Sequence, residues 1–438
     1  MPHTFQKRIY DFLIESQYFP LVEIGQHQQS QLQQLVRFSK AEVPFYKDRL
    51  NCLFRRDGTF NFSRWNEVPI LTRQELLNQR EAMLPDKVPA GHGESADYTG
   101  TGTTGLPVTT RHNNLIAVTS QAALYRAFTW SRLDYAKTFF HWYAPTRETA
   151  RDPQGVINSG WGPPWEESKT KGKTIELNYI NPVEQALALV MQHKPSYVAG
   201  RASSLFDLAQ EADRQKAKVK LDRMYAFGAN ISDASREECL RVFGAKIMSI
   251  YNSREVYDIA HQCPASNNHH VSWELMLVEV LDDDNRPCPP GKQGRCVVTP
   301  FYNTAQPLIR YDLGDQITLG ETCSCGRTLQ VISELNGRTL HMFRLPDGRK
   351  MSPRFHGFLK PLIGAHEWQF AQTAIDTVEV RYLKLVGAPQ SGFDELTKII
   401  RAQMTPTTKV VFKPMAKLPL TAAGKLLEAI CELPPEAH

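Results

Sequence analysis

The chain of 438 residues lacks the features of membrane, fibrous and disordered proteins. No apolar run approaches the roughly 20 residues that span a bilayer. The N-terminal segment MPHTFQKRIYDFLIE carries charges inside its apolar stretch, unlike a signal peptide. Heptads, collagen-like repeats and low-complexity tracts are also missing. We therefore expect a folded cytoplasmic protein with no membrane partner.

The chain also lacks a large excess of charge of one sign. Its 51 basic residues stand against 46 acidic ones, which leaves a net charge of +5. Spread over this length, that excess does not indicate a nucleic-acid surface. The expected partners are therefore small molecules rather than nucleic acid. The sequence leaves open whether the protein is a monomer or a homodimer.

Helix and strand patterns alternate through the middle of the chain and predict an α/β fold. Strand-like runs occupy 196–200 and 246–251, and a helix is expected after Asn181. Ser203 or Ser204 is expected to cap the next helix, and Ser232 or Asp233 the one after it. These features place the helices between buried strands.

The C-terminal third differs in pattern from the middle of the chain. Strand-like runs at 272–280 and 295–300 predict a hairpin inside a β-rich subdomain over 271–335. Strands at 377–383 and 409–412, with a helix over 393–404, predict a small α+β domain. We expect a large N-terminal domain over 1–336 and a small mobile domain over 337–438.

A glycine- and threonine-rich loop, YTGTGTTGLPV, spans residues 98–108. Its glycines allow the backbone to approach an anion closely, and its threonines add hydroxyl donors. Such a loop suits a polyphosphate, although a plain surface turn has the same composition. It lacks the lysine of the GxxxxGK[ST] loop, which excludes that type of NTPase.

This loop resembles the phosphate loop of adenylate-forming enzymes, SSGTTGxP. Within that superfamily the chain is similar to the phenylacetate–CoA ligase group and its capsule-biosynthesis-type relatives. Six further segments match the group's motifs in the expected order: LQQLVRFSKAEVPFYKDRL at 32–50, FGAN at 227–230, YNSRE at 251–255, PLIRYDLGD at 307–315, GR at 337–338 and LPLTAAGK at 418–425. The resemblance covers nearly the whole chain.

The resemblance implies ATP-dependent activation of a carboxylic acid to an acyl-adenylate, followed by acyl transfer to a thiol. Glu255 would then bind Mg²⁺, and Lys425 would bridge the substrate carboxylate and the α-phosphate. Asp315 and Arg338 would contact the ribose. The resemblance also implies further nucleotide contacts by Thr101, Gly102, Thr103, Thr104, Gly105, Gly228, Ala229, Asn230, Tyr251, Asn252 and Ser253.

Two departures from the family pattern bear on mechanism. Arg254 stands where the family has Thr or Ser before the acidic residue, so its guanidinium either reaches a phosphate or turns outward. LPDGR at 345–349 differs from the family segment that lines the pantetheine channel. The acyl acceptor therefore stays open among coenzyme A, an acyl carrier protein and an amine. A rival of another class is an inactive zinc-containing nucleotide-binding or interaction protein, against which Glu255 and Lys425 argue.

Two cysteine-containing segments, HQCPASNNHH at 261–270 and CSCG at 323–326, predict a metal site. Zinc prefers four Cys or His ligands, often as two close pairs from separate loops. The expected ligands are Cys263, His269, Cys323 and Cys325, with His261 and His270 as alternatives. The phenylacetate-ligase relatives include members with a similar arrangement. We expect a structural zinc ion rather than a catalytic one.

The aromatic run AKTFFHWYA at 136–144 falls where the superfamily has an aromatic residue beside its acyl pocket. Trp142 and Tyr143 are the candidates to line that pocket. Core packing explains aromatic residues as often as ligand contact does. The expected substrate is an aromatic carboxylic acid.

Overall fold

The computed structural model describes residues 2–100, 108–143, 152–166, 171–228, 231, 233–338, 342–351, 353, 363–384, 392–419, 427 and 429–434. The chain divides into two compact units. Unit 1 comprises 1–98, 109–313 and 317–335, and unit 2 comprises 99–108, 314–316 and 336–438. None of the helices within the described ranges has the length and apolar character that crossing a bilayer requires.

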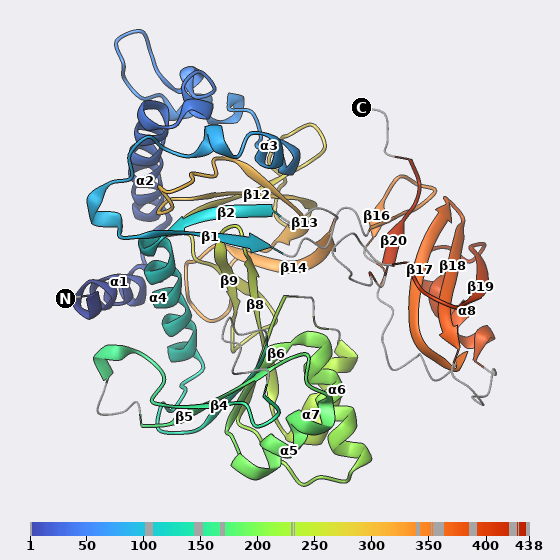
Figure 1. The fold of residues 1–438 in the computed structure, drawn as a ribbon. Coiled ribbons are helices and arrows are strands. Elements are labelled where there is room, and N and C mark those ends of the chain that lie inside the picture. The colour runs from blue at the N-terminus through green and yellow to red at the C-terminus, as the bar shows by residue number, and fades with distance from the viewer. Residues whose placement is uncertain are drawn as a thin grey trace. The chain divides into compact units, whose positions relative to one another are not determined.

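A twelve-stranded sheet is the framework of the first unit (Figure 1). Its order is β11-β12-β13-β14-β10-β9-β8-β7-β6-β3-β5-β4. The strands of this sheet span Met276–Leu281 (β11), Gln293–Pro300 (β12), Tyr311–Leu319 (β13), Val331–Arg338 (β14), His269–Val271 (β10), Tyr257–Gln262 (β9), Lys246–Ser253 (β8), Arg223–Phe227 (β7), Tyr197–Arg201 (β6), Phe139–Tyr143 (β3), Lys173–Asn178 (β5) and Val156–Ser159 (β4). β8, β7, β6, β3 and β5 run parallel to one another, whereas β9 and β4 are antiparallel to their neighbours.

Helices cover both faces of the parallel strands (Figure 1). The helices of one face are α5 (Val183–His193), α6 (Ala202–Arg214) and α7 (Asp233–Phe243), and α4 (Asn114–Trp130) lies on the other. Along β7, Met224 and Ala226 pack in the cluster with α5, α6 and α7, whereas Tyr225 packs in the cluster with α4. This alternation is expected of a strand that is buried on both faces.

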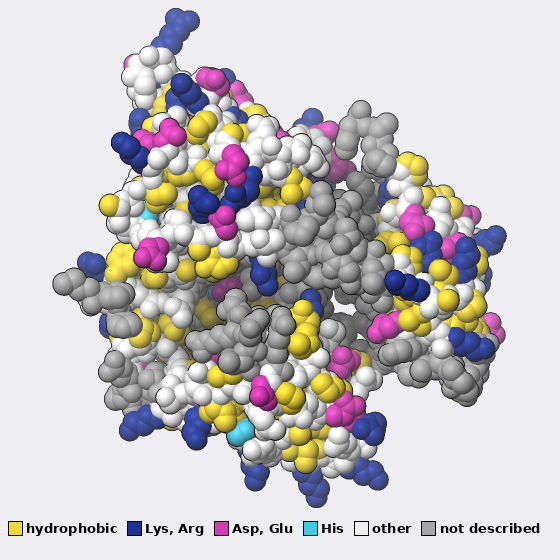
Figure 2. Space-filling view, viewed as in Figure 1, with side chains coloured by type: hydrophobic (Ala, Val, Ile, Leu, Met, Phe, Trp, Pro, Cys, Tyr) yellow, Lys and Arg dark blue, Asp and Glu magenta, His cyan; other side chains and the backbone are white. Residues whose placement is uncertain are grey.

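The N-terminal region contributes α1 (Pro2–Ser16), α2 (Leu21–Glu42) and the short α3 (Arg73–Asn78). α4 follows the two-stranded sheet of β1 (Ser95–Gly100) and β2 (Val108–Asn113) and begins after Asn113, whose side chain accepts a hydrogen bond from the Ile116 amide at 3.1 Å. On the face shown in Figure 2, basic, acidic and hydrophobic side chains are interspersed over the described surface.

The second unit has a four-stranded sheet in the order β19-β18-β17-β20. Its elements are β15 (Phe343–Arg344) and β16 (Lys350–Met351), which form a separate hairpin, then β17 (Ala365–Ala374), β18 (Thr377–Lys384), α8 (Phe393–Gln403), β19 (Lys409–Met415) and β20 (Ala429–Cys431). Its core includes Trp368, Phe370, Leu396 and Ile400. The predicted α/β class with a separate, smaller α+β unit is confirmed.

Several predicted boundaries are shifted. α5 has Pro182 as its N-cap and begins one residue later than expected. α6 begins at Ala202, so Ser203 and Ser204 lie in its first turn instead of capping it. The predicted hairpin of 272–280 with 295–300 is present as β11 and β12, but β11 begins only at Met276. β11 to β14 continue the large sheet and do not form a sheet of their own.

Candidate active site and metal centre

Glu255 lies in the turn between β8 and β9, and its side chain is 11% exposed. Its Oε1 is 3.3 Å from Nη1 of Arg73, whose side chain is 25% exposed. The backbone carbonyl of Glu255 lies 3.2 Å from Nε2 of His112 on β2. An acidic group is therefore held in a largely buried turn, beside a cation from a distant part of the chain.

The start of α3 places Arg73 beside Glu255. Thr72 and Glu75 form a capping box that fixes the first turn of α3. The preceding residue, Leu71, donates to the carbonyl of Arg310 at 2.8 Å and accepts from the amide of Asp312 at 3.0 Å. These bonds anchor the helix start to the large sheet. Sequence reasoning missed Arg73 because 182 positions separate it from Glu255.

His112 is the second partner of this turn. Its ring stacks on Tyr98 with centroids 5.1 Å apart and contacts Tyr257 at 5.0 Å. Burial lowers the pKa of His112 to about 4, although the carbonyl and carboxylate of Glu255 act in the opposite direction. The imidazole is therefore neutral near pH 7, and the positive charge at 3.3 Å from Glu255 comes from Arg73.

The other predicted nucleotide residues fall into three groups. Tyr251, Asn252, Ser253 and the exposed Arg254 lie at the end of β8 and in the turn after it, and Gly228 follows β7 with φ at +76°. Asp315 lies on β13 and belongs to unit 2, as does Arg338 at the end of β14. The predictions that lie outside the described residues are Thr101, Gly102, Thr103, Thr104, Gly105, Ala229, Asn230 and Lys425.

Three cysteines and one histidine form a cluster in the first unit. The ligand atoms of Cys263, His270, Cys323 and Cys325 all lie within 4.8 Å of one another. Sγ of Cys263 is 3.8 Å from Sγ of Cys323, and Sγ of Cys325 is 3.2 Å from Nε2 of His270. A zinc–sulfur bond of about 2.3 Å places two sulfurs of a tetrahedral site about 3.8 Å apart. The cluster therefore has the size of a tetrahedral zinc site.

The histidine of this cluster is His270, whereas His269 was the predicted ligand. β10 pairs with β9 so that His270 lies opposite His261 and His269 lies opposite Gln262. Residues opposite each other in an antiparallel pair share a face, and neighbours along a strand alternate. His270 therefore lies on the same face of the sheet as His261. Cys263 lies on this face too, because it follows His261 by two residues. His269 faces the other side of the sheet.

The cluster is buried among polar and aromatic neighbours. Burial raises the pKa of Cys323, but hydrogen bonds with Ser266, Cys325 and Cys263 outweigh burial and lower the pKa to about 7. Burial lowers the pKa of His270 to about 4. The ring of His270 meets that of Trp130, at the end of α4, edge-on at 5.5 Å. Zinc binds cysteine as the thiolate and histidine as the neutral imidazole, so a thiol that ionises readily and an uncharged His270 both favour binding.

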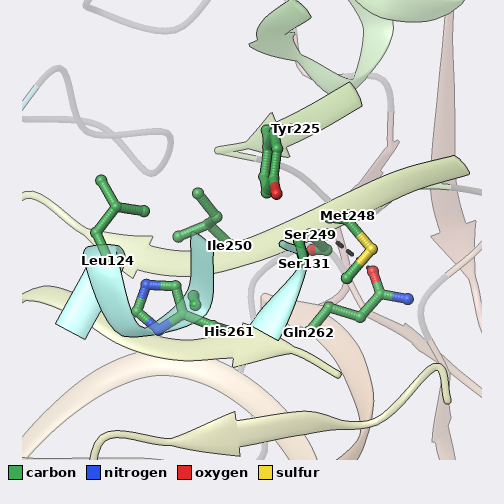
Figure 3. A pocket seen from close by; sticks show the side chains of 9 residues that line it. Leu124, Ser131, Tyr225, Met248, Ser249, Ile250, His261 and Gln262 are labelled. Carbon is green, nitrogen blue, oxygen red and sulfur yellow. Dashed lines mark hydrogen bonds between the residues drawn. The ribbon is translucent and has the colours of Figure 1, made fainter. Parts of the chain in front are cut away.

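A small cavity lies between α4 and β7, β8 and β9 (Figure 3). Trp142, a predicted pocket residue, does not line it: its side chain packs in the core with α5 and α6, on the opposite face of the sheet. Tyr143 lies on the opposite face of the sheet from Trp142, and the centroid of its ring is 6.1 Å from that of Phe227. The residues that line the cavity are Leu124, Ala127, Ser131, Tyr225, Met248, Ser249, Ile250, His261 and Gln262.

Comparison with known sequences gives one partial match. A segment of 164 residues is 32% identical to a phenylacetate-coenzyme A ligase of Thermus thermophilus. The match covers 36% of this chain and 37% of the length of that protein. No protein-family model matches the sequence.

Solved structures match over much more of the chain. A 2-hydroxyisobutyryl-CoA ligase with 2-HIB-AMP aligns with a TM-score of 0.70 at 18% identity, over 95% of this chain and 93% of that one. An open conformation of the same ligase, with 2-HIB-AMP and CoA, aligns with a TM-score of 0.60 at 18% identity, over 92% of this chain and 90% of that one. An anthranilate CoA ligase with anthranoyl-AMP aligns with a TM-score of 0.52 at 14% identity, over 78% of this chain and 67% of that one. The chain therefore has the fold of the adenylate-forming CoA ligases, and these matches support the resemblance that the motifs indicated.

Proposed function

We propose that this chain, which has the fold of the adenylate-forming CoA ligases, activates a carboxylic acid with ATP and transfers the acyl group to coenzyme A. The observation that carries the proposal is the buried Glu255, in the turn that follows β8, within a chain of this fold that has the motifs in order. The 2-hydroxyisobutyryl-CoA ligase, solved with 2-HIB-AMP and CoA, supports both halves of the reaction.

In the first half-reaction, a carboxylate oxygen attacks the α-phosphorus of ATP and pyrophosphate leaves, which gives an acyl-adenylate. The transition state gains negative charge on the phosphate oxygens, so catalysis consists mainly of positioning and charge stabilisation. In the second, a thiolate attacks the acyl carbon and AMP leaves. We assign the phosphates to 101–105, the adenine to Tyr251 and the ribose to Asp315 and Arg338.

Glu255 fits the role of a magnesium ligand. A carboxylate oxygen is a preferred ligand of Mg²⁺, and Glu255 already has a cationic neighbour in Arg73. When bound, Mg²⁺ would neutralise charge on the phosphates. Arg73 and the ion would compete, because both bind the carboxylate of Glu255 and the two positive charges repel each other at this distance.

This competition predicts the effect of Arg73→Ala on the nucleotide-free protein. We expect the affinity of Mn²⁺, a spectroscopic substitute for Mg²⁺, to rise about 3- to 10-fold, because an ion pair that is partly buried contributes about 1 kcal/mol. Titration followed by electron paramagnetic resonance measures it. Arg64→Ala, which removes the surface pair with Glu67, is the matched control. An unchanged Mn²⁺ affinity in Arg73→Ala would contradict the assignment. So would an equal rise in affinity when Arg73→Ala is made in a protein that already carries Glu255→Gln.

We also propose that Cys263, His270, Cys323 and Cys325 hold a structural zinc ion. The proposal is supported by the donor set of three sulfurs and one imidazole nitrogen within 4.8 Å. All four positions of a tetrahedron are taken by the protein, so the ion would have no place for a substrate. The ion would join the end of β9 and the start of β10 to the loop of 323–326.

The C-terminal unit is proposed to act as a mobile domain over 337–438 that brings Lys425 to the reacting phosphate. LPLTAAGK at 418–425 supports this role by its match to the family motif. A lysine suits the task because its charge is compact and its stem is long. The acid is proposed to be aromatic, in line with the aromatic side chains that surround β3 and β7.

The segment 345–349 leaves room for two other acceptors in the second half-reaction. It forms a tight turn between β15 and β16, in which the Leu345 amide donates to the Arg349 carbonyl at 2.8 Å. Because LPDGR differs from the usual family segment at this place, a carrier-protein thiol or an amine is the alternative acceptor. Product analysis with each acceptor, using one acid that is activated, distinguishes them.

Pyrophosphate exchange tests the proposed activation. The purified protein is incubated with ATP, Mg²⁺, labelled pyrophosphate and each acid of an aromatic and aliphatic panel. We expect label to enter ATP only when a suitable acid is present, because exchange requires reversal of adenylate formation. Exchange with none of the acids would contradict the proposal and favour a nucleotide-binding protein without activity.

A further inference from the structure

The cavity between α4 and the strands β7, β8 and β9 contains buried polar groups that the proposed reaction does not use. Tyr225 reaches it from β7 and His261 from β9, with Ile250 of β8 and Leu124 of α4 beside them (Figure 3). Tyr225 is 3% exposed and His261 is 1% exposed. Both side chains therefore depend on the protein interior or on a ligand for their hydrogen bonds.

Neither side chain has its hydrogen bonds satisfied. The hydroxyl of Tyr225 and both ring nitrogens of His261 make no hydrogen bond of standard geometry with the described residues. Oδ2 of Asp258 lies 3.5 Å from Nε2 of His261. Burial raises the pKa of Tyr225, which the neighbouring Ser131 hydroxyl lowers only in part. Leaving such groups unpaired in the protein interior destabilises it, so a polar ligand would be stabilised here.

The remaining walls of the cavity are mostly apolar. Leu124 and Ala127 of α4 face Met248 and Ile250 of β8 across it. The side-chain amide oxygen of Gln262 is already bonded to the Ser249 amide at 2.8 Å, the dashed line in Figure 3. An apolar lining with a few convergent polar groups is typical of a small-molecule site.

The cavity lies on the strands that carry the proposed nucleotide contacts. Ile250 directly precedes Tyr251 on β8, and Tyr225 is three residues before Gly228. A ligand in the cavity would therefore lie close to the end of the sheet where we place the reaction. The space is small and suits a group about the size of one water molecule.

We infer that this cavity is the far end of the acid-binding site and that it receives a hydroxyl group on the acid. The substrate class is then hydroxylated carboxylic acids, with an apolar body between carboxylate and hydroxyl. The substrate hydroxyl would donate to a ring nitrogen of His261 and accept from the hydroxyl of Tyr225. This inference rests on the proposed function, because it assigns the acid of that reaction.

Matched pairs of acids test the inference in the exchange assay. Phenylacetate is compared with 4-hydroxyphenylacetate, and benzoate with 3- and 4-hydroxybenzoate, in the wild type and in Tyr225→Phe. We expect at least one hydroxylated acid to exceed its parent by 10-fold or more in kcat/KM, because a site that binds a hydroxyl rejects the analogue without it. Tyr225→Phe should reduce this preference about tenfold and leave the KM for ATP unchanged.

Tyr125→Phe is the control, since its hydroxyl bonds to the Gly162 carbonyl at 2.9 Å and the residue does not line the cavity. It should keep the preference of the wild type. His261→Leu provides a second variant, which should also lose the preference. Equal rates for each pair, or a preference that survives in both Tyr225→Phe and His261→Leu, would overturn the inference alone. Exchange with no acid would overturn the proposed function and the inference with it.

Discussion

Replacing Lys425 with alanine is expected to lower acid-dependent pyrophosphate exchange about 10²- to 10³-fold. The residue ends the motif LPLTAAGK, and its charge would contact the phosphate as the carboxylate attacks. Losing one charge-assisted contact in a water-poor site costs on the order of 3–4 kcal/mol in the transition state. The affinity for ATP should change little if the contact forms only in the closed state.

Lys417 provides the matched control for Lys425→Ala. It is an exposed lysine of the same C-terminal segment, eight positions earlier, and Lys417→Ala should exchange like the wild type. Acyl transfer from a preformed acyl-adenylate should be less affected in Lys425→Ala, because the proposed movement of the C-terminal unit would give that step a different domain orientation. Exchange near the wild-type rate in Lys425→Ala would remove the basis for a catalytic role of the C-terminal unit.

Loss of zinc is expected in His270→Ala but not in His269→Ala. The two histidines are neighbours on β10 with similar burial, yet only His270 joins the three cysteines. Cys263→Ser and Cys323→Ser should lose the ion too, because each removes one of four ligands. An ion present at a thousand times its Kd stabilises the folded state by about 4 kcal/mol, and each of these variants should lose about that much.

Metal analysis and thermal unfolding of the purified variants measure both effects. Cys52→Ser is the control: this half-buried cysteine is outside the cluster, so its variant should retain zinc and stability. A wild-type protein without stoichiometric zinc would contradict the assignment. Zinc retained in His270→Ala and lost in His269→Ala would show that the strand register has been misread.

The order of the motifs allowed the fold to be predicted, and two of the motifs that lie in described residues occupy strand boundaries. YNSRE contains the end of the parallel strand β8 and the turn after it, and PLIRYDLGD contains the start of β13. Boundaries were less predictable. α6 begins at Ala202, two residues earlier than a cap at Ser203 would place it, and its N-cap is Arg201.

The face of a residue was harder to predict than its element. His269 and His270 are both plausible ligands from spacing, and only the pairing of β10 with β9 decides between them. Trp142 and Tyr143 present the same difficulty on β3, where Trp142 packs beneath α5 and α6. Because strand residues alternate, an error of one position changes the assigned face.

Contacts between distant segments were not predictable from this sequence alone. Arg73 approaches Glu255 because Leu71 pairs with the start of β13, and that pairing has no signature in the sequence near either residue. Tyr225 and His261 likewise come together on the cavity from β7 and β9, on either side of β8 in the sheet. Such contacts depend on the strand order, which periodicity does not reveal.

Transfer of oxygen from the acid to AMP tests the central claim most directly. The protein is incubated with ATP, Mg²⁺, coenzyme A and an acid whose carboxylate carries ¹⁸O. Attack of that carboxylate on the α-phosphorus predicts AMP with one ¹⁸O and pyrophosphate with none, detected by mass spectrometry. AMP or ADP without the label, formed while the acid is consumed, would contradict activation through an acyl-adenylate.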